Sequence, residues 1–257
     1  MSRFLAALGL PRLWTEDEEA VWAFLRAYVG PLVMAVAPVC AYGVERVPRE
    51  GGLVIAANHF SGIDHPALAV ASPRPVCFLS KAELFERPLV GDALTWTGAF
   101  PVRRGEADRA AIQRAVELAA SGRVVAVHLE GTRQSSGRPG VFKPGAVAIA
   151  RRARVPIVPC GLDTSGWTAA NRRPCTVVLG EPISLGDLPA GHRGRAAGLE
   201  LVGQEVVRLW REAVAAREAG FPPELADGSR RSGACIRGLS RRTGSARSQT
   251  KVGPDVL

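Results

Sequence analysis

The chain has little cysteine, and its cysteines follow no metal-binding or disulfide pattern. Five occur in 257 residues, at positions 40, 77, 160, 175 and 235. None forms a C-x-x-C pair, so the sequence indicates neither a zinc site nor a disulfide framework. Most lie in apolar runs, where a free thiol behaves as a small core side chain, and a reducing cytosolic environment fits this usage.

The chain also lacks a long uninterrupted apolar run and a convincing signal peptide. The longest N-terminal candidate, residues 27–43, is too short for a confident membrane span and contains Pro31 and Pro38. Aromatic residues of the type found at membrane surfaces flank it: Trp14, Trp22 and Tyr28. Residues 1–43 are therefore interpreted as a helical, membrane-associating segment, and packing against the protein's own core is the alternative.

No G-x-S-x-G nucleophile elbow is present, which argues against a serine hydrolase of that type. Hydrophobic residues make up 47% of the chain, enough for a substantial core, and the formal net charge is +9. Residues 227–257 hold seven basic and two acidic residues and almost no large apolar ones. This composition predicts a disordered basic tail, which serves solubility or attracts anionic lipid headgroups.

Between these ends, residues 44–226 alternate short apolar runs with amphipathic stretches. Strands are predicted near residues 53–57, 76–80, 99–102, 124–129, 156–162 and 175–183, and helices near 64–72, 82–98, 106–122, 145–153 and 195–219. The alternation predicts a single α/β domain with a central, mostly parallel or mixed sheet flanked by helices, preceded by the N-terminal apolar helical segment.

Three polar clusters follow predicted strands, where α/β proteins place their sites. The first, "NHFSGIDHP", holds His59 and Asp64. An imidazole can take a proton from a hydroxyl near neutral pH, and a carboxylate that fixes its tautomer improves it as a base. The alternative is structural: Asp64 caps the next helix and His59 bonds a backbone carbonyl.

The same residue types also permit a metal site. Asn58, His59, Asp64 and His65 are possible ligands, and adjacent Asp-His pairs occur in metal phosphohydrolases. Such a site needs further ligands after other strands, and His128 and His192 are the histidines that remain. No metal is therefore expected.

The second and third clusters, "VRRGEAD" and "EGTRQ", supply Arg103, Arg104 and Arg133, whose forked donors suit phosphate. Gly105 and Gly131 permit close backbone approach. Solvated loop charges, or a Glu130–arginine pair that joins two loops, would be the structural explanations.

Together these clusters resemble the ordered blocks of the glycerolipid acyltransferase family, which includes 1-acylglycerol-3-phosphate acyltransferases. "NHFSGIDHP" is similar to the N-H-x-x-x-x-D block, "GAFPVRRG" to the second, "EGTRQ" to the third and "VPIVPCGL" to the fourth. The likeness covers residues 41–162 in order. Three departures bear on the acceptor: His128-Leu129 stands where Phe-Pro is common, Gln134 replaces a serine, and Arg103 stands before Arg104 where an acid is common.

The resemblance implies acyl transfer from acyl-CoA or acyl carrier protein to the hydroxyl of a lysophospholipid, most plausibly 1-acylglycerol-3-phosphate, giving phosphatidic acid. His59 would be the base and Asp64 would hold it. The substrate-binding positions it implies are Gly98, Arg104, Glu130, Gly131, Thr132 and Arg133. No cofactor beyond the acyl donor is implied.

Because acyl chains are expensive to expose to water, the enzyme is expected at the cytoplasmic face of the cell membrane, peripheral or shallowly inserted. Other lysolipid, glycolipid or lipid amino acid acceptors remain alternatives. So do a metal-dependent phosphohydrolase and a basic protein that binds membrane or, less plausibly, nucleic acid.

Overall fold

The computed structural model describes residues 18–103 and 108–232, which form an α/β domain around one sheet. The strands are β1 (Val39–Tyr42), β2 (Leu53–Ala57), β3 (Val76–Lys81), β4 (Phe100–Val102), β5 (Val124–His128), β6 (Ile157–Asp163), β7 (Cys175–Leu179) and β8 (Arg231–Ser232). Their order is β4-β3-β5-β2-β6-β7-β1-β8. Five of the seven pairings are parallel, so the predicted mostly parallel or mixed sheet is confirmed.

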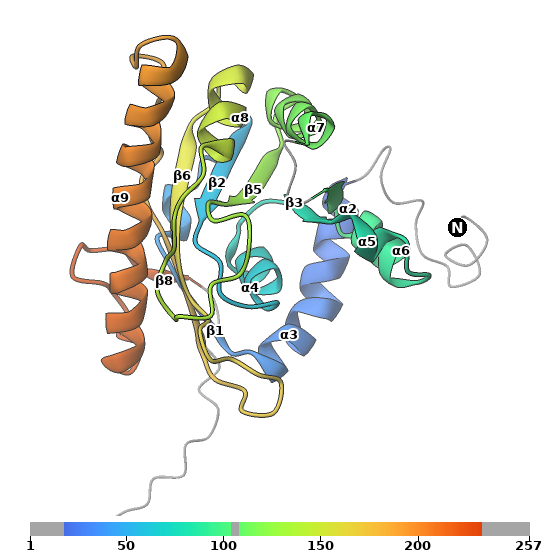
Figure 1. The fold of residues 1–257 in the computed structure, drawn as a ribbon. Coiled ribbons are helices and arrows are strands. Elements are labelled where there is room, and N and C mark those ends of the chain that lie inside the picture. The colour runs from blue at the N-terminus through green and yellow to red at the C-terminus, as the bar shows by residue number, and fades with distance from the viewer. Residues whose placement is uncertain (1–17, 104–107, 233–257) are drawn as a thin grey trace, which may run out of the picture.

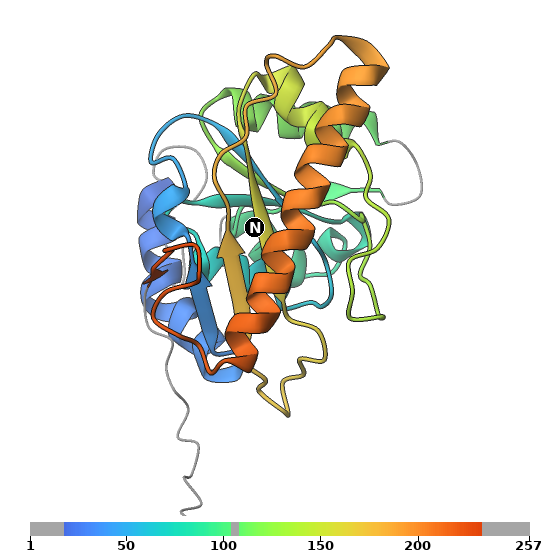
Figure 2. The same cartoon turned by 90° about the vertical axis from the view of Figure 1, so that its left-hand side faces the viewer.

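Helices cover both faces of the sheet (Figure 1). They are α2 (Glu18–Phe24), the π-helical η1 (Leu25–Val29), α3 (Gly30–Val36), the 3₁₀ turn η2 (Val44–Arg46), α4 (Asp64–Ala71), α5 (Ala82–Phe85), α6 (Val90–Trp96), α7 (Arg109–Ala120), α8 (Gly145–Ala153) and α9 (Gly191–Glu218). Long α9 crosses the sheet diagonally on the face that also carries α7 and α8 (Figure 2).

The alternation of side chains along β2 shows how the two layers form. Leu53, Ile55 and Ala57 join the core beneath α3 and α4, whereas Val54 and Ala56 join the core beneath α7, α8 and α9. All five residues are buried, because a parallel strand covered by helices on both faces meets no water. The strand therefore reads as an uninterrupted apolar run in the sequence.

Gly161 explains how closely α9 approaches the sheet. A Cβ atom at this position of β6 would lie 2.2 Å from the backbone carbonyl carbon of Leu209 in α9. Only glycine permits that approach. Helix and strand are thereby packed backbone against backbone at the centre of the domain.

The N-terminal segment is helical from Glu18 to Val36, and its end differs from the prediction. The chain passes Pro31 without a break, with the wider π turn of η1 directly before it, because proline has no N–H to bond the preceding turn. Residues Val39–Tyr42, placed in the helical segment by the sequence, instead form β1. Residues 1–17 lie outside the described part.

The start of the predicted disordered tail is also ordered. Arg231 and Ser232 form β8, which pairs antiparallel with β1 at the sheet edge. Arg46 bonds Asp227 at 2.6 Å and so holds the turn that leads to this strand. Residues 233–257, the remainder of the predicted tail, lie outside the described part.

None of the helices described between residues 18 and 232 combines the length and the apolar character needed to cross a bilayer.

Candidate active site

The first and third sequence blocks meet where β2 and β5 end. Ala57 is opposite His128 in the parallel pairing, so the two strands finish level. The backbone then continues the contact, since Leu129 N donates to Ala57 O at 2.8 Å and Gln134 N donates to His59 O at 2.8 Å. The loop that carries Glu130 to Arg133 is therefore fastened directly to the loop that carries His59.

His59 and Asp64 form a buried pair. Nδ1 of His59 lies 2.7 Å from Oδ2 of Asp64, and the two residues are 4% and 0% exposed. The same carboxylate accepts hydrogen bonds from the amides of Phe60 at 2.7 Å and Ser61 at 3.1 Å. On its other side, Oδ1 accepts from the hydroxyls of Ser61 and Thr164. The carboxylate is thus surrounded by donors, which is the environment of an ionised group.

These donors decide the charge of Asp64. Burial alone would raise its pKa, but the hydrogen bond from His59, the nearby His128 ring and the Thr164 hydroxyl bring the pKa below its ordinary value. Because an ionised Asp64 only accepts hydrogen bonds, Nδ1 of His59 carries the proton. Nε2 of neutral His59 is therefore the basic nitrogen.

The expectation that Asp64 might be the N-cap of its helix is wrong. Ile63 occupies that position, and Asp64 is the first residue of α4. Its side chain folds back over the β2–α4 loop and bonds amides of that loop instead. The five-residue spacing thus brings the carboxylate back to the histidine ring.

Asn58 ties this loop to the neighbouring strand. Its Nδ2 donates to the carbonyl of Leu162 at 2.9 Å, and its Oδ1 accepts from the Leu162 amide at 2.8 Å. The side chain thereby replaces two backbone hydrogen bonds where β2 has ended but β6 continues. This fixes the backbone immediately before His59.

Three imidazoles and a phenyl ring stack beside the pair. The His59 and His128 centroids are 4.0 Å apart with planes within 10°, and those of His128 and His65 are 4.9 Å apart. His65 stacks in turn on Phe78 at 4.7 Å. Burial, followed by repulsion from the other two imidazoles, brings the pKa of His128 well below its ordinary value. His128 is therefore neutral at pH 7.

Glu130 of the third block is 1% exposed and lies under the loop rather than on it. Its Oε1 accepts a long hydrogen bond from the Gly140 amide at 3.4 Å, and Oε2 is buried without a hydrogen-bond partner. Burial raises the pKa of Glu130 to about 7, against the opposing effect of backbone amides. This carboxyl is half protonated near neutral pH.

The remaining predicted positions lie in different surroundings. Arg133 lines the same cavity as His59. Gly131 has a φ of 69°, and Gly98 has a φ of 83° between α6 and β4, so both occupy left-handed turns. Thr132 is exposed on the loop surface. Arg104 lies outside the described residues.

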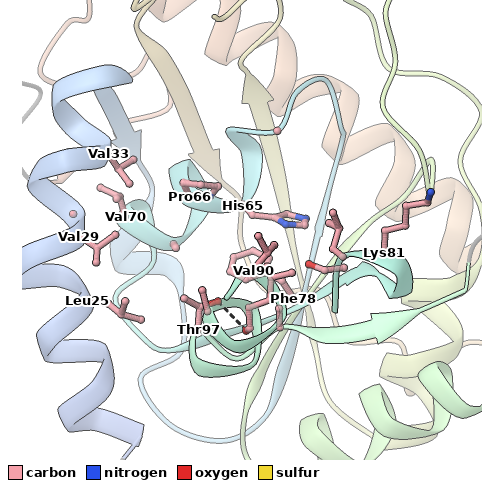
Figure 3. A pocket seen from close by; sticks show the side chains of 18 of the residues that line it. Leu25, Val29, Val33, His65, Pro66, Val70, Phe78, Lys81, Val90 and Thr97 are labelled. Atoms are coloured by element: carbon pink, nitrogen blue, oxygen red, sulfur yellow. Dashed lines mark hydrogen bonds between the residues drawn. The ribbon is translucent and has the colours of Figure 1, made fainter. Parts of the chain in front are cut away.

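A cavity of about 720 Å³ opens from His59. Helices α2, η1, α3, α4 and α6 and strand β3 supply its mostly apolar walls. In Figure 3, Leu25, Val29 and Val33 lie at one end and Lys81 at the other, with His65 between them. The base thus faces a long, mostly apolar compartment whose lining also includes the basic residues Arg26, Lys81 and Arg133.

Comparison with known proteins identifies the family of the chain. A protein-family model described as Acyltransferase matches residues 38–163. The 1-acyl-sn-glycerol-3-phosphate acyltransferase of Bacillus subtilis is 32% identical over 177 residues, which span 66% of this chain and 87% of that enzyme. The chain belongs to the acyltransferase family. It is an O-acyltransferase.

More distant relatives share parts of this acyltransferase. A chloroplastic 1-acyl-sn-glycerol-3-phosphate acyltransferase of Brassica napus is 34% identical over 127 residues, 48% of this chain and 37% of that protein. The crystal structure of the Thermotoga maritima 1-acyl-sn-glycerophosphate acyltransferase has a TM-score of 0.61 at 22% identity, covering 77% of this chain and 84% of that one. The latter is a likeness of fold.

The proposed Asp64-His65 metal pair does not form in the acyltransferase. The carboxylate of Asp64 faces His59 and Thr164, whereas the ring of His65 lies between His128 and Phe78. Donor atoms of His59, Asp64 and His128 do lie within 4.8 Å of one another. An ion there would have to displace the hydrogen bond that orients His59.

Sequence reasoning missed several residues of the site. Thr164 follows β6, just beyond the fourth block, and only the fold brings it to Asp64. Lys81, the last residue of β3, lines the cavity, but it lies just beyond the predicted strand and was assigned no role. The N-terminal helices were assigned to the membrane, and their inward side also forms cavity wall.

Proposed function

We propose that this acyltransferase transfers a fatty acyl group from acyl-CoA or acyl carrier protein to the free hydroxyl of 1-acylglycerol-3-phosphate, forming phosphatidic acid. The observation that carries the proposal is the His59–Asp64 pair at the mouth of an apolar cavity that Arg133 also lines. The printed names of the relatives point to the same acceptor.

The chemistry follows from the tautomer of His59. Nε2 takes the proton of the acceptor hydroxyl as its oxygen attacks the thioester carbonyl. A carbon–oxygen bond forms, the carbon–sulfur bond breaks, and the proton passes from His59 to the departing thiolate. Asp64 holds the ring and stabilises the transient imidazolium, as a carboxylate does in a catalytic triad. The substrate itself is the nucleophile, so no covalent enzyme intermediate is required.

The cavity offers different surroundings to the acyl chain and to the phosphate of the substrates. Its aliphatic walls suit an acyl chain, since each buried CH₂ contributes about 0.8 kcal/mol. Arg133 and Lys81 also line the cavity, and their positive charge would hold a phosphate monoester. Arg104 from the second block would add a further guanidinium, and Glu130, Gly131 and Thr132 would shape the loop around it.

The surface beside the cavity supports attachment to the cytoplasmic face of the cell membrane. Tyr28 and Leu32 are 66% and 68% exposed on η1 and α3, and Leu89 is 64% exposed beside α6. These elements flank the cavity. Apolar side chains at its rim would enter the headgroup region and let lipid substrates pass without crossing water.

The packing of Gln134 is a reason to test a second class of acceptor. Its side chain donates to Thr132 O at 3.1 Å and folds against Gly140, where an added Cβ would lie 2.4 Å from Oε1. The loop next to Arg133 is therefore tighter than a serine would make it. The same reaction on another lysolipid or on a lipid amino acid is the alternative.

The test is a lipid mass-spectrometry assay. Purified protein receives acyl-CoA or acyl carrier protein thioesters with lysophosphatidic acid, lysophosphatidylglycerol, lysophosphatidylcholine or a hydroxylated lipid amino acid. We expect phosphatidic acid, formation unaffected by chelator, and a loss of about a thousandfold or more in His59→Ala. His192→Ala, at an exposed histidine of α9, is the matched control. Absence of thioester consumption with every acceptor would refute the proposal, and chelator sensitivity would favour a metal enzyme.

A further inference from the structure

His128 contacts the proposed base without lining the cavity. It is the last residue of β5, and its ring covers one face of His59 at a centroid distance of 4.0 Å and an interplanar angle of 10°. The cavity lining includes His59 and His65 but not His128. The ring thus lies against His59 and not among the residues that line the cavity.

A hydrogen bond and a ring contact fix the His128 ring. Nδ1 lies 2.8 Å from the carbonyl oxygen of Asn58, and a carbonyl only accepts, so this nitrogen carries a proton. The ring also contacts His65 at a centroid distance of 4.9 Å, and His65 in turn stacks on Phe78. Asn58 is itself locked to Leu162 through two hydrogen bonds. The position of the ring is thus set by β2, α4, β3 and β6 together.

Asp64 alone leaves one motion of His59 open. A single hydrogen bond at Nδ1 fixes the direction of that nitrogen, but the ring can still rock about this contact. A planar group held parallel against its face removes that freedom. Of the two rings that stack on His59, His128 lies closer, with a centroid distance of 4.0 Å against 5.9 Å for His65.

We propose that His128 is a positioning residue, whose ring face fixes the plane of the His59 imidazole so that Nε2 is presented to the cavity. The inference rests on the proposed role of His59 as base and names a residue where the resembling blocks usually carry another type. A neutral ring suits the task, because a second cation against His59 would oppose its protonation. Groups that face His128 are His59, Asp64 and His65.

Two variants separate the ring from the hydrogen bond. His128→Phe keeps an aromatic face but removes the donor to Asn58, whereas His128→Asn can keep an N–H donor to that carbonyl but removes the ring. We expect kcat to fall about tenfold or more in His128→Asn and about threefold or less in His128→Phe, because small misplacements of a base are costly. The KM for the acceptor should change less than about twofold in both, because His128 does not line the cavity.

A substrate-free measurement distinguishes this inference from the proposed reaction. The His59 Nδ1 proton, hydrogen-bonded to Asp64, can be followed by NMR through its rate of exchange with water. Faster exchange in His128→Asn than in wild type and His128→Phe, with all three folded by thermal melting, supports positioning even if no acceptor is found. Equal exchange and equal kcat in folded variants, or a larger kcat loss in Phe than in Asn, would overturn it.

Discussion

The β2–α4 loop and the N-terminal helices α2, η1 and α3 build opposite sides of one cavity by different means. In the loop, Asn58 and Asp64 are fully buried and each makes two or more hydrogen bonds to defined partners. The helices contribute apolar side chains, and no residue of η1 is buried. Polar groups in a low-dielectric site must be fixed in place, whereas acyl chains need only an apolar wall.

The attachment of the helices underlines this contrast. Met34 enters the main core and Trp22 and Val33 pack against it, whereas the polar attachments of these helices lie at their C-terminal end. There the β6–β7 loop donates two hydrogen bonds, from Trp167 Nε1 to Val36 O at 3.1 Å and from Arg172 to Ala35 O. The catalytic residues are thus held in place by many hydrogen bonds. The N-terminal helices, which form one wall of the cavity, are joined to the rest of the domain by few polar contacts.

Asp64→Asn disrupts the hydrogen bonds of the β2–α4 loop and should cause the largest loss of activity. An amide at this position can present N–H where His59 Nδ1, Phe60 N and Ser61 N all need an acceptor. The favoured His59 tautomer would reverse, and we expect kcat to fall by about 10³- to 10⁴-fold. Thioester consumption under saturating substrate measures it.

Asp163→Asn is the matched control for that change. Asp163 is also a buried acid at the end of β6, but it pairs with Arg217 at 2.5 Å and Arg173 at 3.4 Å, away from His59. Its loss should lower thermal stability and leave turnover within about threefold. Equal kcat losses in the two variants would mean that Asp64 acts only through folding.

Glu130→Gln tests the neighbouring loop through stability. The folded pKa is raised from 4.5 to about 7, so the folded state binds the proton more tightly than the unfolded chain. Stability is then fully present below about pH 4.5 and is lost as pH rises through 7, by about 3 kcal/mol. Glutamine stays neutral, and we expect it to abolish this loss.

Denaturant melts at pH 5 and pH 8 measure the effect, with exposed Glu86→Gln as the control. The wild-type midpoint should fall at pH 8, and the Glu130→Gln midpoint should exceed it there. If the two proteins differ equally at both pH values, the buried carboxyl is not the cause, and a partner for its free oxygen must exist.

The same contrast explains what the sequence predicted. Buried parallel strands are continuous apolar runs in the sequence, so β2, β5, β6 and β7 could be predicted from it. The spacing from His59 to Asp64 likewise indicates a local turn. Strand β1 was missed because Val39–Tyr42 prolongs an apolar helical stretch, and only pairing with β7 decides its state. Thr164 lies 100 residues from Asp64, a contact that no local pattern specifies. The cavity wall was hidden because its residues are ordinary aliphatics.

The smallest expected effect concerns the outward-facing side of the N-terminal helices η1 and α3. Replacing both Tyr28 and Leu32 with serine removes two exposed apolar side chains but no core contact. Transfer of each into the headgroup region contributes roughly 1 kcal/mol, so binding to anionic phospholipid vesicles should weaken about tenfold or more. The control is Val33→Ala, which lies on the same helix and lines the cavity. Cosedimentation should separate them, with the control at wild-type binding. Unchanged binding of the double variant would place the membrane contact elsewhere. Activity on short-chain, water-soluble thioesters should survive in the double variant, because the His59–Asp64 pair does not depend on the outward-facing side chains.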